Sequence, residues 1–255
     1  INDPKDLKKK EITLTDSLKY SSNTAMVEIS KKIGFKKLMF FYRDLGLMKR
    51  TKVSLPAESS GIFREPNVGD KISPLTMSFG QGFAVTPIQL AYGLAALVNG
   101  GKTVEPQIVR QIRTRYFGEF GRNEKKSEVQ NILKESNSRR LRHMLSEVVS
   151  EEGSGKLAAL DHVLKAMGKT GTSQRFNRER KSYVGGGYWS SFWGAFPKEN
   201  PQIGVLVIFE TDSKGEYYGG KVAAPAFKEI AEAALRFIGL ELNLSPALKS
   251  LSLVE

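Results

Sequence analysis

Cysteine is missing from the 255 residues of this sequence. Its absence excludes thiol nucleophiles, disulfides and cysteine-ligated zinc sites. Only two histidines occur, His143 and His162, and we expect both to be surface or structural residues. Paired carboxylates and metal ligands at diagnostic spacing are also lacking. The sequence therefore predicts no metal and no cofactor, and it gives little support to histidine-based catalysis.

Long apolar runs are missing as well. Neither a run of about 18 apolar residues nor a signal-peptide pattern is present. Hydrophobic residues make up 40% of the sequence and charged residues 26%, which suits a globular chain with a substantial core. The net charge is +12. The basic residues form small groups without an aromatic platform pattern, so we expect solvated basic faces and no nucleic-acid partner.

Helix signals fill the first part of the chain. Thr86 followed by Pro87 is a strong helix start, because a hydroxyl cap precedes a proline at the first helical position. Residues 49–78 contain several prolines and are expected to form a loop. The helices expected here span 24–33, 36–45, 87–98 and 138–151.

After Gly155 the pattern changes to short, apolar and partly β-branched segments separated by turn residues, which predict strands. The segments are 162–173, 191–197 and 203–212, and a helix over 221–238 follows them. Helices first, then a cluster of strands closed by a helix, indicate an α+β fold with a sheet covered by helices.

The stretch AMGKTGTSQ, residues 166–174, fits two kinds of site. A phosphate loop, G-x-x-x-x-G-K-[ST], needs its first glycine so that backbone N–H groups can curl round the phosphate. Val163 occupies that position, which argues against a nucleotide site. The other interpretation is a strand beside a cleft, where Lys169 supplies positive charge, threonine hydroxyls bind a carboxylate and Gly171 lets a ligand approach the backbone.

A second motif lies far upstream. Ser21-Ser22-Asn23 fits S-x-N and directly precedes a predicted helix. Serine and asparagine are favoured helix caps, so a purely structural role is open for this motif by itself. Together, however, S-x-N and K-T-G are part of the signature of penicillin-binding proteins and serine β-lactamases.

The sequence resembles the transpeptidase domain of the class B penicillin-binding proteins, over roughly Leu14 to Leu240. Segments similar to the family follow in the expected order: PAESSG at 56–61, SFGQGFAVTPIQLA at 78–91, SFWGAFPKENP at 191–201 and YYGGKVAAPAFKEI at 217–230. ESSG and the YYGG segment look most like the division-type branch. The resemblance implies the fold of penicillin-binding proteins and serine β-lactamases, an α+β fold with an antiparallel sheet flanked by helices and a mainly helical subdomain.

The family's nucleophile, the serine of S-x-x-K, has no counterpart, because no serine in this chain is followed by lysine three residues later. We expect the chain to be the C-terminal portion of a transpeptidase domain, with the nucleophilic serine and its lysine upstream of residue 1. The expected organisation is a mainly helical part over about 1–152, sheet strands and a C-terminal helix over about 153–240, and a tail over 241–255.

The resemblance implies roles for individual residues. The implied catalytic residues are Ser21, Asn23, Lys169 and Thr172, and the implied substrate-binding residues are Ser22, Thr170, Gly171, Thr172 and Tyr183. Ser21 would relay a proton, Asn23 would bind the substrate's amide carbonyl, and Lys169 would give electrostatic support. Thr170 and Thr172 would hold a terminal carboxylate, and the Thr172 N–H would form half of an oxyanion hole. Tyr183 lies in the stretch 174–187, which fits a loop bordering the cleft and fits a solvated hairpin connection equally well.

The implied function is that of a peptidoglycan D,D-transpeptidase, which attacks the D-Ala-D-Ala bond of a stem peptide through a serine acyl-enzyme and is the target of β-lactams. A non-catalytic β-lactam-sensing or scaffold module of the same fold and a serine β-lactamase are the alternatives. The implied partners are stem peptides, β-lactam antibiotics, a division glycosyltransferase and other cell-wall machinery. The implied location is the periplasm, at the extracytoplasmic face of the inner membrane, with an N-terminal membrane anchor outside this chain.

Overall fold

The computed structural model describes residues 3, 11–67, 69–109, 111–115, 118–122, 129–160, 165–177, 179–212 and 214–238. His162 and the predicted tail over 241–255 lie outside these ranges. The chain divides into two compact units, one formed by residues 1–26 and 139–255 and the other by residues 27–138. The start of the chain therefore belongs with its last part, which differs from the expected division near residue 152.

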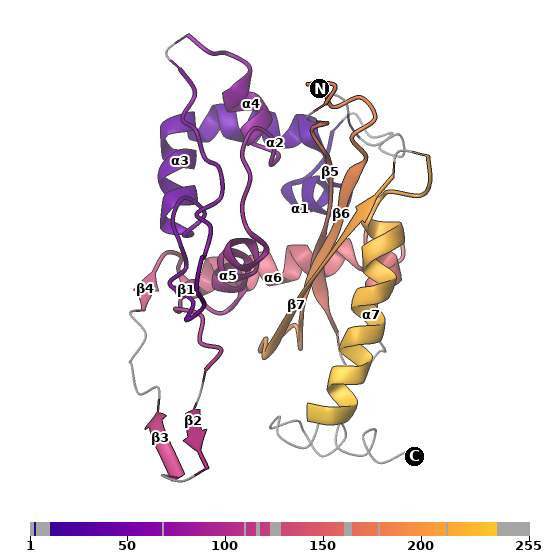
Figure 1. The fold of residues 1–255 in the computed structure, drawn as a ribbon. Coiled ribbons are helices and arrows are strands. Elements are labelled where there is room, and N and C mark those ends of the chain that lie inside the picture. The colour runs from indigo at the N-terminus through magenta and orange to yellow at the C-terminus, as the bar shows by residue number, and fades with distance from the viewer. Residues whose placement is uncertain are drawn as a thin grey trace. The chain divides into compact units, whose positions relative to one another are not determined.

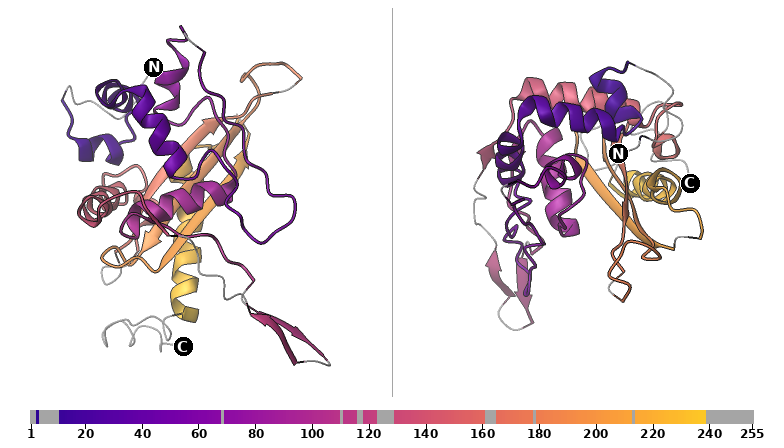
Figure 2. Two further views of the ribbon diagram at one scale, coloured as in Figure 1. Left: turned by 90° about the vertical axis from the view of Figure 1, so that its left-hand side faces the viewer. Right: turned by 90° about the horizontal axis from the view of Figure 1, so that it is seen from above.

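The first unit is built on an antiparallel sheet of three strands in the order β5-β6-β7. The strands are β5 (Met167–Gln174), β6 (Tyr188–Phe196) and β7 (Ile203–Thr211). The long helix α7 (Gly219–Ile238) lies along one face of this sheet, as all views show (Figures 1 and 2). The predicted α+β class, with its antiparallel sheet and helical cover, is confirmed.

Aromatic side chains fill the space between this sheet and α7. Phe192 of β6 and Phe227 of α7 are fully buried, with ring centroids 4.9 Å apart. Burial of each such side chain contributes about 1.5 to 3 kcal/mol to stability. A Cβ atom on Gly168 would lie 2.4 Å from the Phe192 ring. The glycine before Lys169 therefore makes room for a core phenylalanine.

Short helices complete the first unit. α1 (Leu14–Lys19) begins with a capping box in which Asp16 N–H donates to Thr13 Oγ1 at 3.1 Å and Thr13 N–H donates to the Asp16 carboxylate at 3.0 Å. The 3₁₀ helix η1 (Lys156–Ala158) follows the end of α6 (Glu135–Val148). The boundaries between the two units fall inside α6 and inside α2 (Asn23–Ile33).

The second unit is mainly helical. It contains α3 (Phe35–Asp44), α4 (Ser73–Met77), α5 (Pro87–Val98) and two short antiparallel pairs, β1 (Lys102–Thr103) with β4 (Gln130–Asn131) and β2 (Gln111–Thr114) with β3 (Gly118–Arg122). The predicted helices over 24–33, 36–45 and 87–98 are confirmed, with ends that agree within one residue. The expected loop over 49–78 is interrupted by α4. No helix in the described part of the chain has the length and apolarity needed to cross a bilayer.

A fully buried glutamine holds the irregular part of the second unit in place. Gln89 lies in the first turn of α5, where its side-chain oxygen accepts from Thr86 N–H at 2.8 Å. Its amide nitrogen donates to the backbone oxygens of Lys49 at 2.7 Å and Ser60 at 3.0 Å. One buried side chain thus hydrogen-bonds to the backbone of three segments, which explains the glutamine after the Thr86-Pro87 helix start.

Candidate active site

The structure brings the two sequence motifs together within the first unit. Lys169 lies on β5, and its Nζ donates to Ser21 Oγ at 2.7 Å and to the backbone oxygen of Thr170 at 3.0 Å. Ser21 and Lys169 are 148 residues apart in the sequence. The sheet residue and the S-x-N residue therefore form one hydrogen-bonded pair.

Lys169 is partly shielded from water. The residue is half-buried, and burial of the ammonium lowers its pKa from the ordinary value of 10.5 to about 8. A lysine with such a pKa is mostly charged at pH 7 but can release its proton at small cost. It can therefore act as a positive charge for an anionic ligand and as a hydrogen-bond partner whose protonation changes near neutral pH.

Ser21 has an unusual backbone. Its φ is 57°, in the left-handed region that residues other than glycine rarely adopt. The chain is held in this conformation by hydrogen bonds from Ser21 N–H to Leu18 O at 3.2 Å and from Ser22 N–H to Ser17 O at 3.0 Å. Such a conformation costs about 1 to 3 kcal/mol and is found preferentially at functional sites.

Ser22 and Asn23 start the next helix. Ser22 is fully buried, and its hydroxyl oxygen accepts from Ala25 N–H at 3.1 Å, as expected of a helix cap. The Ser22 hydroxyl also donates to Asp3 at 3.0 Å. Asn23 is half-buried at the first position of α2. Because the Ser22 hydroxyl is used for capping, we leave Ser22 out of the substrate-binding residues proposed below.

Burial by itself would raise the pKa of Asp3, but hydrogen bonds from Thr24, Ser22 and the backbone of Asn23 hold it below its usual value. A carboxylate at the first turn of a helix is also favoured by the helix dipole. Asp3 therefore stabilises the start of α2 as a second acceptor beside Ser22.

The hydroxyl residues that follow Lys169 share one side of β5. Thr170 and Thr172 alternate with Lys169 and Gly171 along the strand, so their side chains lie on the opposite face from Lys169. Thr172 Oγ1 accepts from Gly219 N–H at 3.0 Å, and Thr170 Oγ1 lies 3.2 Å from Ser154 Oγ. A Cβ atom on Gly171 would lie 2.5 Å from Ser191 Oγ, so the Ser191 side chain would have to rotate to accommodate a larger residue here.

The N-terminus of α7 is packed directly on this strand. A Cβ atom on Gly219 would lie 2.4 Å from Gly171 O and 2.2 Å from Ser191 O. Gly219 therefore lets the first N–H of a 20-residue helix reach the Thr172 hydroxyl. The positive end of the helix dipole is thereby directed at the same side chain.

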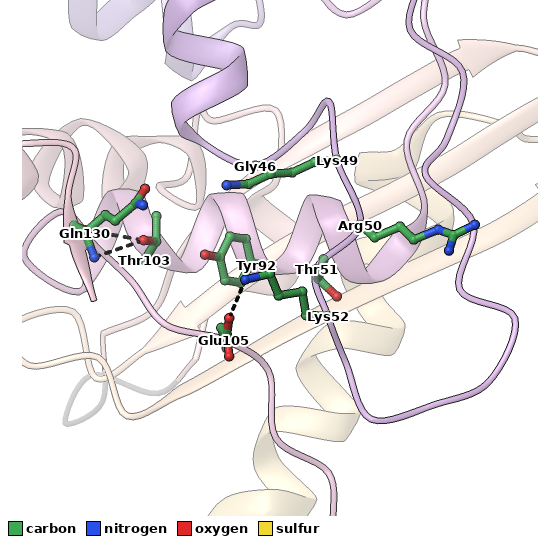
Figure 3. Close-up of a pocket in the computed structure, with 9 residues that line it drawn as sticks. All are labelled: Gly46, Lys49, Arg50, Thr51, Lys52, Tyr92, Thr103, Glu105 and Gln130. Carbon is green, nitrogen blue, oxygen red and sulfur yellow. Dashed lines mark hydrogen bonds and ion pairs between the residues drawn. The ribbon is translucent and has the colours of Figure 1, made fainter. Parts of the chain in front are cut away.

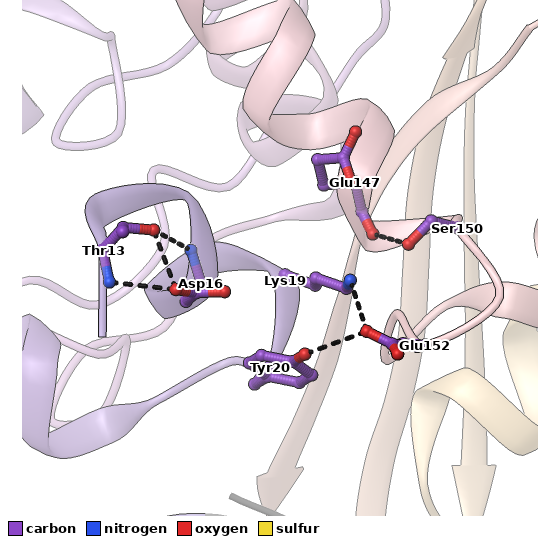
Figure 4. Close-up of polar contacts among 7 residues, drawn as sticks. All are labelled: Thr13, Asp16, Lys19, Tyr20, Glu147, Ser150 and Glu152. Carbon is purple, nitrogen blue, oxygen red and sulfur yellow. Dashed lines mark hydrogen bonds and ion pairs between the residues drawn. The ribbon is translucent and has the colours of Figure 1, made fainter. Parts of the chain in front are cut away.

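The loop over residues 152–155, which sequence reasoning missed, contacts the segments of both motifs. Lys19 Nζ contacts Glu152 at 3.0 Å, and Tyr20 donates to the same carboxylate at 3.4 Å (Figure 4). Burial would lower the pKa of Lys19, but the hydrogen bond to Glu152 holds it above its usual value. Lys19 and Tyr20 directly precede Ser21, so Glu152 helps to fix that segment. The glycines on either side of Ser154 were the only signal of this loop in the sequence.

Tyr183 is not part of the Lys169 cluster. It lies in the connection between β5 and β6, where its ring packs edge-on against Phe176 with centroids 5.4 Å apart, and 53% of its surface is exposed. Arg175 and Trp189 form a cation–π contact at 5.4 Å in the same region. The structure therefore gives Tyr183 a packing partner in the hairpin, and its substrate-binding role stays a prediction.

The second unit has a hollow of its own, between the loop after α3, α5 and the β1–β4 pair (Figure 3). It is lined by Gly46, Lys49, Arg50, Thr51, Lys52, Tyr92, Thr103, Glu105 and Gln130. Lys52 pairs with Glu105 at 3.2 Å. Glu58 of the PAESSG segment organises this loop, because its carboxylate accepts from Thr51 N–H and the Thr51 hydroxyl at 2.6 Å each. Within the described ranges, no group of His, Asp and Glu side chains is suited to a metal ion.

An antiparallel sheet with helical cover, and a K-T-G strand that contacts an S-x-N serine, define the fold class of the penicillin-binding proteins and serine β-lactamases. The family model described as the penicillin binding protein transpeptidase domain matches residues 2–232. The chain belongs to this transpeptidase family.

Curated relatives agree with this membership. The peptidoglycan D,D-transpeptidase FtsI of Escherichia coli K12 is 30% identical over 91% of this chain and 37% of its own length. Stage V sporulation protein D of Bacillus subtilis 168 is 30% identical over 90% of this chain and 35% of its own length. The chain thus spans little more than a third of these relatives.

Solved structures agree as well. The transpeptidase domain of penicillin-binding protein 3 from Burkholderia pseudomallei, in its apo form, is 26% identical, with a TM-score of 0.75, 92% of this chain covered and 67% of that one. Penicillin-binding protein 3 from Mycobacterium tuberculosis, complexed with aztreonam, is 25% identical with a TM-score of 0.77, 92% of this chain covered and 53% of that one. The predicted family and fold are therefore confirmed.

Proposed function

We propose that this chain is part of a peptidoglycan D,D-transpeptidase, which forms a serine acyl-enzyme on the D-Ala-D-Ala end of a stem peptide and transfers the acyl group to an amine of a neighbouring stem. β-Lactams would acylate the same serine. The observation that carries the proposal is the contact at 2.7 Å between Lys169 Nζ and Ser21 Oγ, two residues whose motifs are separated by most of the chain.

The geometry supports a division of labour at this site. Ser21 Oγ, held by the Lys169 ammonium, is placed to pass a proton to a leaving or attacking nitrogen. Lys169 supplies positive charge for a terminal carboxylate at the free edge of β5, and the hydroxyls of Thr170 and Thr172 supply donors to it from the other face of the strand. The Thr172 N–H provides half of the oxyanion hole, and Asn23 binds the amide of the substrate. The nucleophilic serine and its lysine stay a prediction for the region upstream of residue 1.

The position of β5 supports a peptide substrate. Within the described sheet, β5 has β6 on one side and no strand on the other. An edge strand of this kind offers backbone N–H and C=O groups to an extended peptide, which can bind by strand addition. Lys169, Thr170 and Thr172 lie on this strand, so a stem peptide that pairs with its edge has its reacting end beside them.

The similarity to FtsI and to a protein named for sporulation supports the division-type branch. We propose the periplasmic face of the inner membrane as the site of action, since the substrate is there. A glycosyltransferase of the division machinery is the proposed partner, because new glycan strands must be supplied before their stems can be cross-linked.

Labelling with a fluorescent penicillin tests this function. The full-length protein should form a covalent adduct that survives denaturing electrophoresis and is lost only slowly. Lys169→Ala should reduce the rate of labelling by about 100-fold, because it removes both the charge for the carboxylate and the partner of Ser21. Lys165→Ala is the matched control, since Lys165 is an exposed lysine just before β5 and should leave the rate unchanged.

The outcome separates the three hypotheses. A long-lived adduct and D-Ala release from a stem pentapeptide support the transpeptidase. A long-lived adduct without D-Ala release supports a β-lactam sensor, and rapid turnover of the penicillin supports a β-lactamase. A full-length protein that forms no adduct refutes the enzyme proposal.

A further inference from the structure

Ser154 connects the two segments that form the site. Its backbone N–H donates to Lys19 O at 3.1 Å, two residues before Ser21. Its hydroxyl lies 3.2 Å from Thr170 Oγ1, directly after Lys169. Ser154 is therefore in direct contact with the segment of each motif.

Ser154 is also fixed from a third side. A Cβ atom on Gly220, in the first turn of α7, would lie 2.1 Å from Ser154 O and 3.4 Å from the Thr170 methyl carbon. A side chain at Gly220 would therefore collide with the Ser154 backbone, so this glycine lets the start of α7 pack against Ser154 and Thr170. The position of the Ser154 hydroxyl is set by this packing and by the hydrogen bond to Lys19.

A hydroxyl group has one proton to donate and can accept hydrogen bonds at the same time. Thr172 Oγ1 accepts from Gly219 N–H, so its own proton must point to another acceptor. Thr170 is in the equivalent situation if Ser154 donates to it. Both threonine hydroxyls would then present their protons to a ligand, and a carboxylate is a group that can only accept them.

We propose that Ser154 is a positioning residue of this site, which donates its proton to Thr170 Oγ1 and thereby directs the Thr170 proton to the terminal carboxylate of the ligand. The inference rests on the proposed function, because it assumes that Thr170 binds that carboxylate. It assigns to the 152–155 loop a role in favouring a free carboxylate, whose charge strengthens these hydrogen bonds, over a neutral ester or amide.

Two penicillins test the assignment in the full-length protein. One is a fluorescent penicillin with its free carboxylate, and the other is the methyl ester of the same compound. We measure the second-order rate constant of acylation for each and take the ratio of acid to ester. Ser154→Ala should lower this ratio about tenfold, the effect of losing one hydrogen bond to a charged group. Ser154→Thr keeps the hydroxyl and should restore the ratio to within about threefold of wild type.

A second variant separates positioning from folding. Thr170→Val removes the group that Ser154 is proposed to orient, so adding Ser154→Ala to it should change the ratio by less than about twofold. A full tenfold loss in that background overturns the proposal. An equal loss of rate toward acid and ester in Ser154→Ala also overturns it, because a purely structural role affects both ligands alike.

Failure of this inference differs from failure of the proposed function. A wild-type protein that forms an adduct, combined with an unchanged ratio in Ser154→Ala, refutes the role of Ser154 alone. A wild-type protein that forms no adduct with either compound refutes the enzyme proposal and this inference together.

Discussion

Acylation by a penicillin with a free carboxylate should fall steeply above pH 8, because Lys169 then loses the charge that attracts the ligand. Burial lowers the pKa of this residue to about 8. It is then about 90% charged at pH 7 and about 10% charged at pH 9, so the rate of labelling should decrease about tenfold between these two pH values. A lysine with the ordinary value of 10.5 would keep its charge over the whole range.

The same pKa predicts an opposite trend in stability. Because the pKa is about 8 in the folded protein and near 10.5 in the unfolded chain, the unfolded chain binds more protons between these pH values. The contribution of Lys169 to the free energy of unfolding therefore rises with pH over that window, by up to about 3 kcal/mol. Urea unfolding at pH 8 and pH 10, compared with Lys169→Met, isolates this contribution from that of other groups.

Stopped-flow or gel-based labelling of the full-length protein from pH 6 to pH 10 measures the predicted decrease in the rate of acylation. Lys169→Arg serves as one control, because arginine stays charged and its profile should be flat, whatever its absolute rate. Lys165→Met serves as the other and should reproduce the wild-type profile. The reasoning is refuted if the wild-type rate is constant up to pH 10, or if Lys169→Arg shows the same decrease.

Three further predictions concern the framework of the site. Ser22→Ala should lower stability by about 1 kcal/mol without altering acylation, because the hydroxyl caps α2; a loss of acylation would restore Ser22 to the substrate-binding residues. Gly219→Ala should slow acylation at least about tenfold, since the added Cβ would displace α7 from the strand and from Thr172. An unchanged rate would show that the close packing of α7 on β5 does not matter for acylation. Gln89→Leu should lower the urea-unfolding free energy by about 2 to 4 kcal/mol, since the carbonyls of Lys49 and Ser60 lose their donor; a change below about 1 kcal/mol would show that water replaces it.

Local signals in the sequence predicted the elements whose formation depends on local chemistry. Thr86 and Pro87 start α5 where the hydroxyl cap and the proline indicated, because both act within one turn. The predicted 138–151 helix begins and ends three residues earlier in the structure. α6 begins at Glu135, and Ser138 is a buried residue inside it, whose hydroxyl donates to Leu97 O at 2.7 Å. A serine that bonds to a distant backbone cannot be told from a cap by its sequence.

The two motifs could be recognised in the sequence, but the contact between them could not. K-T-G and S-x-N could be found as motifs, yet nothing local predicts that Lys169 Nζ donates to Ser21 Oγ, since the contact depends on how the whole first unit folds. The lowered pKa of Lys169 follows from that packing. Glu152 and Ser154 went unnoticed because their contacts with Lys19 and Thr170 connect segments far apart in the chain. The short strands β1 to β4 were missed because two to five residues carry no recognisable periodicity.

On the proposed function, the left-handed backbone of Ser21 restricts how this site can change under selection by β-lactams. A bacterium can escape a β-lactam by changing residues that touch the drug, provided that the protein still folds. At a φ of 57° only glycine, asparagine and aspartate are accommodated with little strain, and none of them carries a hydroxyl. Threonine, the nearest chemical substitute for serine, is β-branched and fits this conformation poorly. Resistance should therefore arise around Ser21, in its neighbours and supporting loops, while Ser21 itself is retained.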